Sequence, residues 1–318
     1  MTWGDGRIVS LGRPALWLGL LLGSAGLAAA LPADAFDQAL AENPLRAFHP
    51  NDVVIASDHG ESRIRFLVSF QYGVAPFAKD AFGLGAYRFD GLQFAYDGLY
   101  DFDAWTRHSQ PIVSRLQNPG MFFAFRAPQP ERWMGLESWD LGWFHESNGQ
   151  VVDNQTEYDA LYAKIGQAAT DSVSRGWDYW YLGSKFTWSG DKLRLRFAPT
   201  LRVFDGSEAV DYTPAEQDVF WRAGAPASVI YDYDGLRAAF SAEWLLPWRA
   251  LSYAGLETDL RTGYNSGHFA ENWSEHVALT LKAWYIPVFA YFDNGYGPYI
   301  SDYSTWSQGW GIGIQYWR

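Results

Sequence analysis

The chain has 318 residues, of which 48% are hydrophobic and 18% aromatic, and this composition excludes a disordered protein. It contains no cysteine, which excludes disulfide frameworks, thiolate metal sites and cysteine nucleophiles. Its 24 basic and 36 acidic residues give a net charge of -12, and this charge argues against a nucleic-acid partner, because phosphate binding depends on Lys and Arg.

The first 30 residues have the features of an export signal. Arg7 and Arg13 precede or begin an apolar run that extends from Ala15 to Leu27, and the alanines at 28–30 supply the small residues of a cleavage site. The run is shorter than the ~20 apolar residues of a membrane span, so a retained anchor is the less favoured alternative. We therefore predict a signal peptide over 1–30 and a single domain over 31–318.

Most of the remaining chain alternates between bulky apolar residues and charged, small or polar ones, which indicates β-strands. The alternation is clearest over 192–197 and 309–317. In chain order, further strands are predicted over 63–72, 85–96, 121–126, 136–147, 177–188, 236–246, 256–264 and 276–293. Turn sequences such as Asn118-Pro119-Gly120 lie between them.

Two all-β architectures fit this pattern: a soluble β protein with apolar faces inside, or a transmembrane antiparallel barrel with apolar faces turned to lipid. Aromatic residues gather near predicted strand ends, at 177–181, 244–248 and 284–285, as in the aromatic girdles of membrane barrels. Charged residues within strands, such as Arg194 and Arg196, suit a polar lumen better than a dry core. The pattern favours an antiparallel transmembrane β-barrel of about 12 strands.

One segment departs from the strand pattern. Between Gln155 and Val173 the residues Tyr158, Leu161 and Ile165 recur at helical spacing. The sequence therefore predicts a partly helical loop inserted outside the barrel.

The predicted strand over 136–147 ends with a pair of side chains that suits ester hydrolysis. His145 and Ser147 are two residues apart and share a face with Leu141 and Trp143, the face that a membrane barrel turns to lipid. Polar groups are costly there and are functional candidates. A neutral imidazole can take the serine proton, a carboxylate or amide can orient the imidazole, and the N–H of Gly149 can face a developing oxyanion. The alternative is that both are ordinary polar residues at a strand end.

No other motif of catalysis or metal binding is evident in the sequence. It lacks a glycine-rich phosphate loop, a G-x-S-x-G elbow and a His-Glu-x-x-His helix. The remaining histidines are not at metal-ligand spacing and are predicted to be surface or loop residues; they are His49, His59, His108, His268 and His276.

The segment His145-Glu146-Ser147-Asn148-Gly149 resembles the H-x-S-N-G signature of bacterial outer-membrane phospholipase A. The stretch over 174–181 is similar to the S-R-x-W-N-x-x-Y segment of that family, and 295–303 is similar to its closing G-Y-G-x-x-x-x-D-Y hairpin. The likeness extends from about Phe48 to the C-terminus.

The resemblance implies a twelve-stranded outer-membrane barrel with an active site on its outer surface, active as a homodimer. The implied reaction is calcium-dependent hydrolysis of acyl esters of phospholipids and lysophospholipids. Carried over by position, Ser147 is the nucleophile, His145 the general base and Gly149 the oxyanion amide. The positions that match calcium ligands are Ser109, Gln150 and Ser174.

The sequence departs from the family at the residue that orients the histidine, the third member of the catalytic triad. Where the family has Asn, this chain has Asp178 after the matching Trp177, and an insertion separates it from the histidine and serine. Asp159 lies at the ungapped spacing but lacks the Ser-Arg-x-Trp context, so Asp178 is favoured. The alternative to an enzyme is a porin-like barrel in which the H-x-S triplet is incidental.

Overall fold

The structure is a computed structural model that describes residues 45–58, 61–74, 80–102, 112–127, 135–152, 155–166, 169, 172–205, 230–248, 250–265, 267, 271–284, 286–296 and 306–316. All of them belong to the unit Pro44–Arg318. The predicted signal peptide lies outside the described residues. No helix within the described ranges is long and apolar enough to cross a bilayer.

The described chain is built almost entirely from strands. They are β1 (Leu45–Arg46), β2 (Asn51–Asp58), β3 (Glu61–Gly73), β4 (Gly83–Leu84), β5 (Tyr87–Phe102), β6 (Ile112–Arg126), β7 (Gly135–Ser147), β8 (Gly176–Ser189), β9 (Leu193–Phe204), β10 (Gly235–Leu245), β11 (Leu251–Gly263), β12 (Ser274–Ala283), β13 (Ile286–Tyr296) and β14 (Trp306–Tyr316). Two helices complete the list, α3 (Gln155–Ile165) and the short 3-10 helix η3 (Ile230–Asp232).

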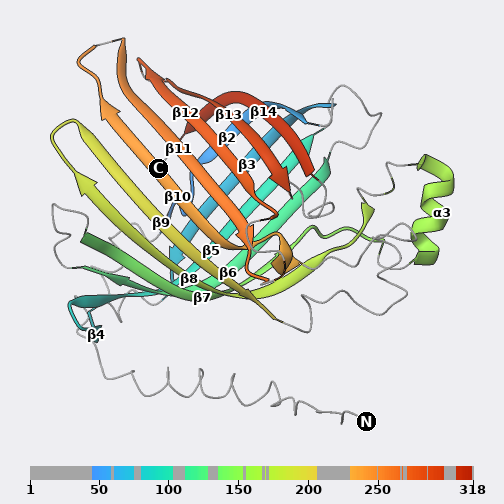
Figure 1. Ribbon diagram of the computed structural model, residues 1–318, viewed down its shortest axis with the longest axis horizontal. Helices are drawn as coiled ribbons and strands as arrows, with labels where there is room; N and C mark the ends of the chain where they lie inside the picture. The colour runs from blue at the N-terminus through green and yellow to red at the C-terminus, as the bar shows by residue number, and fades with distance from the viewer. Residues whose placement is uncertain are drawn as a thin grey trace, which may run out of the picture. The chain divides into compact units, whose positions relative to one another are not determined.

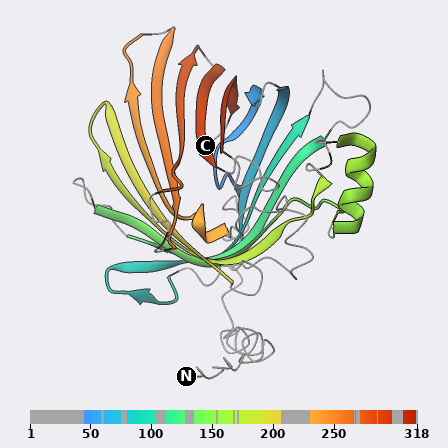
Figure 2. The same ribbon diagram turned by 45° about the vertical axis from the view of Figure 1, so that its right-hand side comes forward.

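Twelve of the described strands close into an antiparallel barrel (Figure 1, Figure 2). Neighbours in sequence pair in turn from β5 to β14, and β3 pairs with both β2 and β5. The ring closes where β14 pairs with β2. The two short strands lie outside this ring: β1 pairs with the end of β3, and β4 with the start of β5. The predicted fold class, an antiparallel barrel of about 12 strands, is confirmed.

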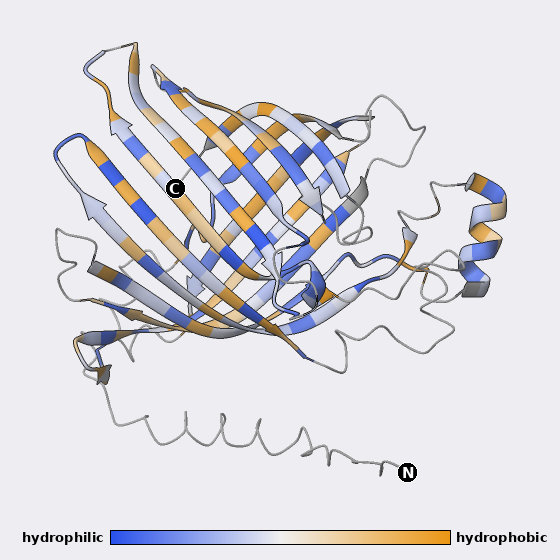
Figure 3. Cartoon of the chain, in the orientation of Figure 1, coloured by the Kyte–Doolittle hydropathy of each residue, from blue (hydrophilic) through white to orange (hydrophobic). Residues whose placement is uncertain are grey.

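Hydrophobic and hydrophilic residues alternate along many of the strands (Figure 3), as expected where successive side chains point to opposite faces of a sheet. In β7, Phe144 and Glu146 are buried inside, whereas Leu141, Trp143 and His145 lie on the outer face. Large apolar side chains are exposed on the outside of the neighbouring strands, among them Met121, Trp180, Leu182 and Val203. An apolar exterior around a polar lumen is typical of a membrane barrel.

The structure differs from the sequence-based prediction at two turns. Residues 276–293, predicted as one strand, form two strands that turn at Trp284, whose φ of 53° is left-handed without a glycine to signal it. Conversely, the predicted turn at Asn118-Pro119-Gly120 lies inside β6. The β6–β7 pairing passes from Gln117↔Ser147 to Gly120↔Phe144, because Pro119 has no N–H to contribute to the ladder.

The predicted aromatic girdle over 177–181 is only partly correct. Trp180 is exposed on the outer face, but Trp177 and Tyr179 face the lumen and are 5% and 1% exposed. They belong to a buried aromatic cluster with Phe144 and Phe204. The cause is the period of two, since neighbouring residues of a strand cannot share a face.

The two rims of the barrel differ in the length of their connections. One rim has tight turns, as between β8 and β9 and between β12 and β13. The other rim carries the long β7–β8 and β9–β10 connections, and α3 of the first extends beyond it (Figure 1). The helix occupies Gln155–Ile165 and contains the residues predicted at helical spacing, so the prediction of a partly helical insertion is confirmed. Both His145 and Ser147 lie at the long-loop end of β7.

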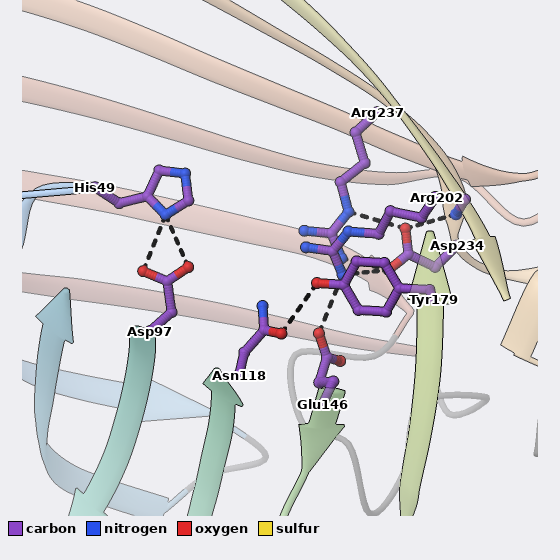
Figure 4. Close-up of polar contacts among 9 residues, drawn as sticks. His49, Asp97, Asn118, Glu146, Tyr179, Arg202, Asp234 and Arg237 are labelled. Carbon is purple, nitrogen blue, oxygen red and sulfur yellow. Dashed lines mark hydrogen bonds and ion pairs between the residues drawn. The ribbon is translucent and has the colours of Figure 1, made fainter. Parts of the chain in front are cut away.

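The interpretation of the histidines as surface or loop residues is wrong for His276 and correct for His49, which lies in the connection between β1 and β2 and is exposed. His276 lies in β12 on the lumen side, with its Nδ1 2.6 Å from Oδ1 of Asp293. The imidazole of His49, between β1 and β2, has its Nδ1 2.9 Å from Oδ2 of Asp97 (Figure 4). In both cases the strand that carries the carboxylate places it beside the histidine in the lumen. The other three histidines, His59, His108 and His268, lie outside the described residues.

Candidate active site

The register of β7 and β8 brings His145 and Asp178 together on the outer face. The two residues are direct cross-strand partners, and His145 Nδ1 is 2.8 Å from Asp178 Oδ1, a hydrogen-bonding distance. The side chains are 40% and 18% exposed. Asp159, the rival third member, lies in α3. The contact required of a histidine-orienting carboxylate is therefore made by Asp178.

Ser147 is the last residue of β7 and pairs with Gly176, the first residue of β8. Gly176 allows the serine and the histidine to lie close to β8: a Cβ there would lie 3.3 Å from Ser147 Cβ, tighter than ordinary contact, and 3.6 Å from His145 Cε1. The ring edge that carries Cε1 and the serine therefore both lie against Gly176. Because Asp178 holds Nδ1, Nε2 is the ring nitrogen left to accept the serine proton.

Asn148 fixes the chain directly after β7. Its side chain is 2% exposed and bonds the segment before β8: Nδ2 donates to the carbonyl of Val173 at 2.7 Å, and Oδ1 accepts from the N–H of Arg175 at 3.0 Å. The backbone N–H of Asn148 also donates to the carbonyl of Arg175, at 3.1 Å. The two ends of the inserted loop are therefore joined beside the histidine and serine.

Gly149 follows in the left-handed region, with φ of 57°, a conformation that costs other residues roughly 1–2 kcal/mol. Its carbonyl accepts a hydrogen bond from Nη2 of Arg115 at 2.8 Å. A Cβ at Gly149 would lie 3.9 Å from both Arg115 Nε and Gln117 Nε2. The turn that would present the Gly149 N–H to an oxyanion is thus anchored by β6.

Two of the three predicted calcium ligands lie on facing segments. Gln150 follows Gly149, and Ser174 precedes β8; between these segments the N–H of Val152 donates to Ser172 at 3.0 Å, and the N–H of Ser174 donates to Val152 at 2.7 Å. Calcium binds carbonyl and hydroxyl oxygens, and both residues have such oxygen ligands. Ser109 lies outside the described residues. Across the described ranges, no three His, Asp or Glu side chains cluster to hold a metal ion.

A charged network supports the site from the lumen (Figure 4). Glu146, between the histidine and the serine, forms an ion pair with Nη1 of Arg202 at 3.0 Å. The Arg202 guanidinium lies 4.6 Å from the ring centroid of Tyr179, which follows Asp178 in β8. The Tyr179 hydroxyl donates to Asn118 of β6 at 3.0 Å. The lumen side chains therefore link the strands that carry the outer site.

Asp234, just before β10, closes this network. Its carboxylate lies 3.4 Å from Arg202 and accepts a hydrogen bond from Nε of Arg237 at 2.9 Å. Burial alone would raise the pKa of the Asp234 carboxyl, but the charges of Arg237 and Arg202 outweigh burial and lower this pKa below its ordinary value. Asp234 therefore remains a carboxylate and keeps the two arginines paired.

Sequence reasoning missed three residues next to the site. Gly176 could have been found only from the register that pairs it with Ser147. Arg115 carried no signal, because its contact with Gly149 joins residues of different strands and loops. Glu146 is only the variable residue of the H-x-S motif, although its position between two outward residues places it in the lumen.

These features define a β-barrel of the outer-membrane type, with a histidine, a serine and an aspartate gathered on its outer surface. No protein-family model and no curated protein matches the chain. The structure of outer membrane phospholipase A from Escherichia coli is similar, with a TM-score of 0.54 at 14% identity, and covers 85% of this chain and 97% of that chain.

A second similar structure is the Salmonella typhi outer membrane phospholipase dimer with bound calcium. Its TM-score is 0.55 at 15% identity, and the match covers 90% of this chain and 98% of that chain. The fold of the chain is therefore that of outer membrane phospholipase A, and the resemblance drawn from the sequence motifs is confirmed at the level of the fold.

Proposed function

We propose that the chain is an outer-membrane phospholipase that hydrolyses acyl esters of phospholipids and lysophospholipids. The observation that carries this proposal is the hydrogen bond between His145 and Asp178 on the outer face, beside Ser147. Orienting a histidine by a carboxylate next to a serine is the arrangement of serine esterases. Its place among apolar side chains is where a bilayer lipid would meet it.

The roles follow from the contacts. As Ser147 Oγ attacks the ester carbonyl, Nε2 of His145 takes the hydroxyl proton, and Asp178 stabilises the resulting imidazolium through Nδ1. The tetrahedral intermediate places its negative charge near the turn after β7, where the N–H of Gly149 stabilises it. His145 then returns the proton to the leaving alcohol, and water hydrolyses the acyl-serine by the same steps.

We further propose that a calcium ion binds beside this turn. Gln150 and Ser174, together with Ser109, would hold it, and when bound it would supply positive charge to stabilise the oxyanion. The Salmonella typhi neighbour is a dimer with bound calcium, which supports the proposal that this chain also binds calcium and acts as a homodimer.

The lumen favours this function over a porin-like barrel. Buried aromatic side chains, including Phe122, Phe144 and Tyr179, pack together inside the barrel, and ion pairs such as Arg65–Asp101 add to the lumen filling. A porin instead keeps a water-filled channel.

Calcium removal tests the proposed function directly. In phospholipid–detergent mixed micelles with calcium, we expect the barrel to release fatty acid, and excess chelator should lower the rate by about 10²–10³-fold, the cost of losing an oxyanion donor. The measurement is titration of released acid, with calcium added back as the control. Equal rates with chelator would exclude the calcium site, and a folded barrel without any release would favour the porin-like alternative.

A side chain added at Gly176 should impair the enzyme without unfolding it. Gly176→Val places a branched side chain against Ser147 and His145, and we expect kcat/KM to fall by about 10²-fold, because small misplacements of reacting groups have effects of this size. Ser184→Val, on the same strand and face but away from the site, is the matched control. If both variants keep wild-type rates, the ester does not bind against Gly176.

A further inference from the structure

The outer face next to Ser147 carries an arginine one row nearer the long-loop rim. Gln117 of β6 pairs with Ser147. Arg115 precedes Gln117 by two residues in the same strand, so both side chains face outward. Arg115 pairs in turn with Tyr100 of β5, another residue of this face. Two residues of a strand span about 7 Å, so Arg115 lies about 7 Å nearer the long-loop rim than the level of Ser147.

Arg115 differs from the arginines of the lumen. There, Arg65 and Arg202 are paired with carboxylates. Arg115 makes no ion pair with any carboxylate of the described ranges; its one hydrogen bond is from Nη2 to the carbonyl of Gly149, and its Nε is shielded from solvent without a partner there. Within the described ranges, the guanidinium of Arg115 therefore lies on the outer face without an anionic partner.

The apolar residues of the same outer face indicate how a bound lipid is oriented along the barrel. Away from the rim, the neighbours of Ser147 are apolar: Leu141 and Trp143 in β7, and Trp180 and Leu182 in β8. Acyl chains of a lipid in the leaflet run along these side chains toward the middle of the bilayer. The headgroup then lies toward the rim, and with an ester carbonyl at Ser147, the phosphate is several ångströms further on, at the level of Arg115.

We propose that Arg115 is the subsite for the phosphodiester of the substrate, a site that makes the enzyme prefer phospholipids to neutral glycerides. Guanidinium groups bind phosphate oxygens in pairs, and this bond strengthens where water is scarce. Since the same guanidinium holds the carbonyl of Gly149, a bound phosphate draws the lipid against the turn that stabilises the oxyanion. The subsite rests on the proposed function, because it presupposes an ester at Ser147.

A pair of substrates tests the subsite. Phosphatidylcholine and diacylglycerol with the same acyl chains are presented in the same nonionic detergent micelles at the same calcium concentration, to wild type, Arg115→Gln and Arg115→Lys. We expect Arg115→Gln to lower kcat/KM for phosphatidylcholine about tenfold or more, as for a lost charge-assisted hydrogen bond. Its kcat/KM for diacylglycerol should fall by only about threefold, the effect of losing the hydrogen bond to the Gly149 carbonyl. Arg115→Lys should lose less on phosphatidylcholine than Arg115→Gln.

Two controls sharpen the comparison. Arg88→Gln removes an exposed arginine near the start of β5, at the opposite rim, and should leave both rates unchanged. Glycerophosphocholine carries the phosphodiester without acyl chains. It should not inhibit at concentrations comparable to the lipid, because only a lipid that is held by its acyl chains brings its phosphate to Arg115. Strong inhibition by it would instead assign the site to free phosphodiesters and overturn the proposal.

Equal losses on the two lipids would mean that Arg115 acts only by holding Gly149, and no loss on either would remove it from the site; both results overturn the subsite while the esterase stands. A wild-type barrel that hydrolyses neither lipid overturns the proposed function and the subsite together. The diacylglycerol rate also reports whether each variant is folded.

Discussion

Ser147→Ala is expected to abolish fatty-acid release, with a loss of about 10⁴-fold or more, because alanine leaves His145 without a hydroxyl to activate. Ser147 ends β7, and its pairing with Gln117 and Gly176 is made by the backbone, so the substitution leaves this strand pairing intact. The measurement is acid release from mixed micelles with calcium, on barrels shown to be folded by their resistance to protease.

The matched control for this variant is Ser184→Ala, which removes a serine hydroxyl from the outer face of β8 away from the site. It should retain the wild-type rate. A folded Ser147→Ala barrel with full activity would exclude this serine as the nucleophile and, with it, the mechanism.

Asp178→Ala should have the second largest effect, a loss of about 10³–10⁴-fold in kcat, because the His145 ring would lose both the bond that orients it and the charge that stabilises its protonated form. Asp178→Asn keeps an oxygen that can accept the Nδ1 proton, and it restores the residue that the phospholipase motif has here. We therefore expect Asp178→Asn to retain far more activity than Asp178→Ala, as measured by kcat in the same assay.

Asp159→Ala is the matched control, since it removes a carboxylate from α3, the segment that offered the rival third member. Its rate should remain close to that of wild type. A severe loss with Asp159→Ala, together with a nearly harmless Asp178→Ala, would reverse the assignment.

The barrel could be predicted from the sequence because alternation is a local property. The residues of each strand indicate which of its faces contacts lipid. In β7, Leu141 and Trp143 lie on the outer face, and Phe144 and Glu146 on the inner face. Local signals failed where the deciding contact was not local. Trp284 turns the chain without a turn residue, and Gly120 lies in a strand because the ring of Phe144 occupies the place of its absent side chain.

The candidate site was predictable to the same extent. His145 and Ser147 are two residues apart, so their common face follows from the strand alone. Their relation to Asp178 depends on the register across an insertion, and no residue spacing reveals that register; the motif context selected the aspartate. Arg115 and Gly176 belong to other strands, and only pairing between strands brings them beside the serine.

The bonds that Asn148 makes to Val173 and Arg175, with the Val152–Val173 bridge just beyond, have a consequence for how this barrel tolerates change. They form a collar at the base of the excursion that holds α3, so the length and content of the excursion are uncoupled from the spacing of the reactive groups. Closing a longer loop costs little free energy once its ends are fixed. Evolution or an engineer can therefore graft a foreign module above the collar and leave the chemistry beneath it intact.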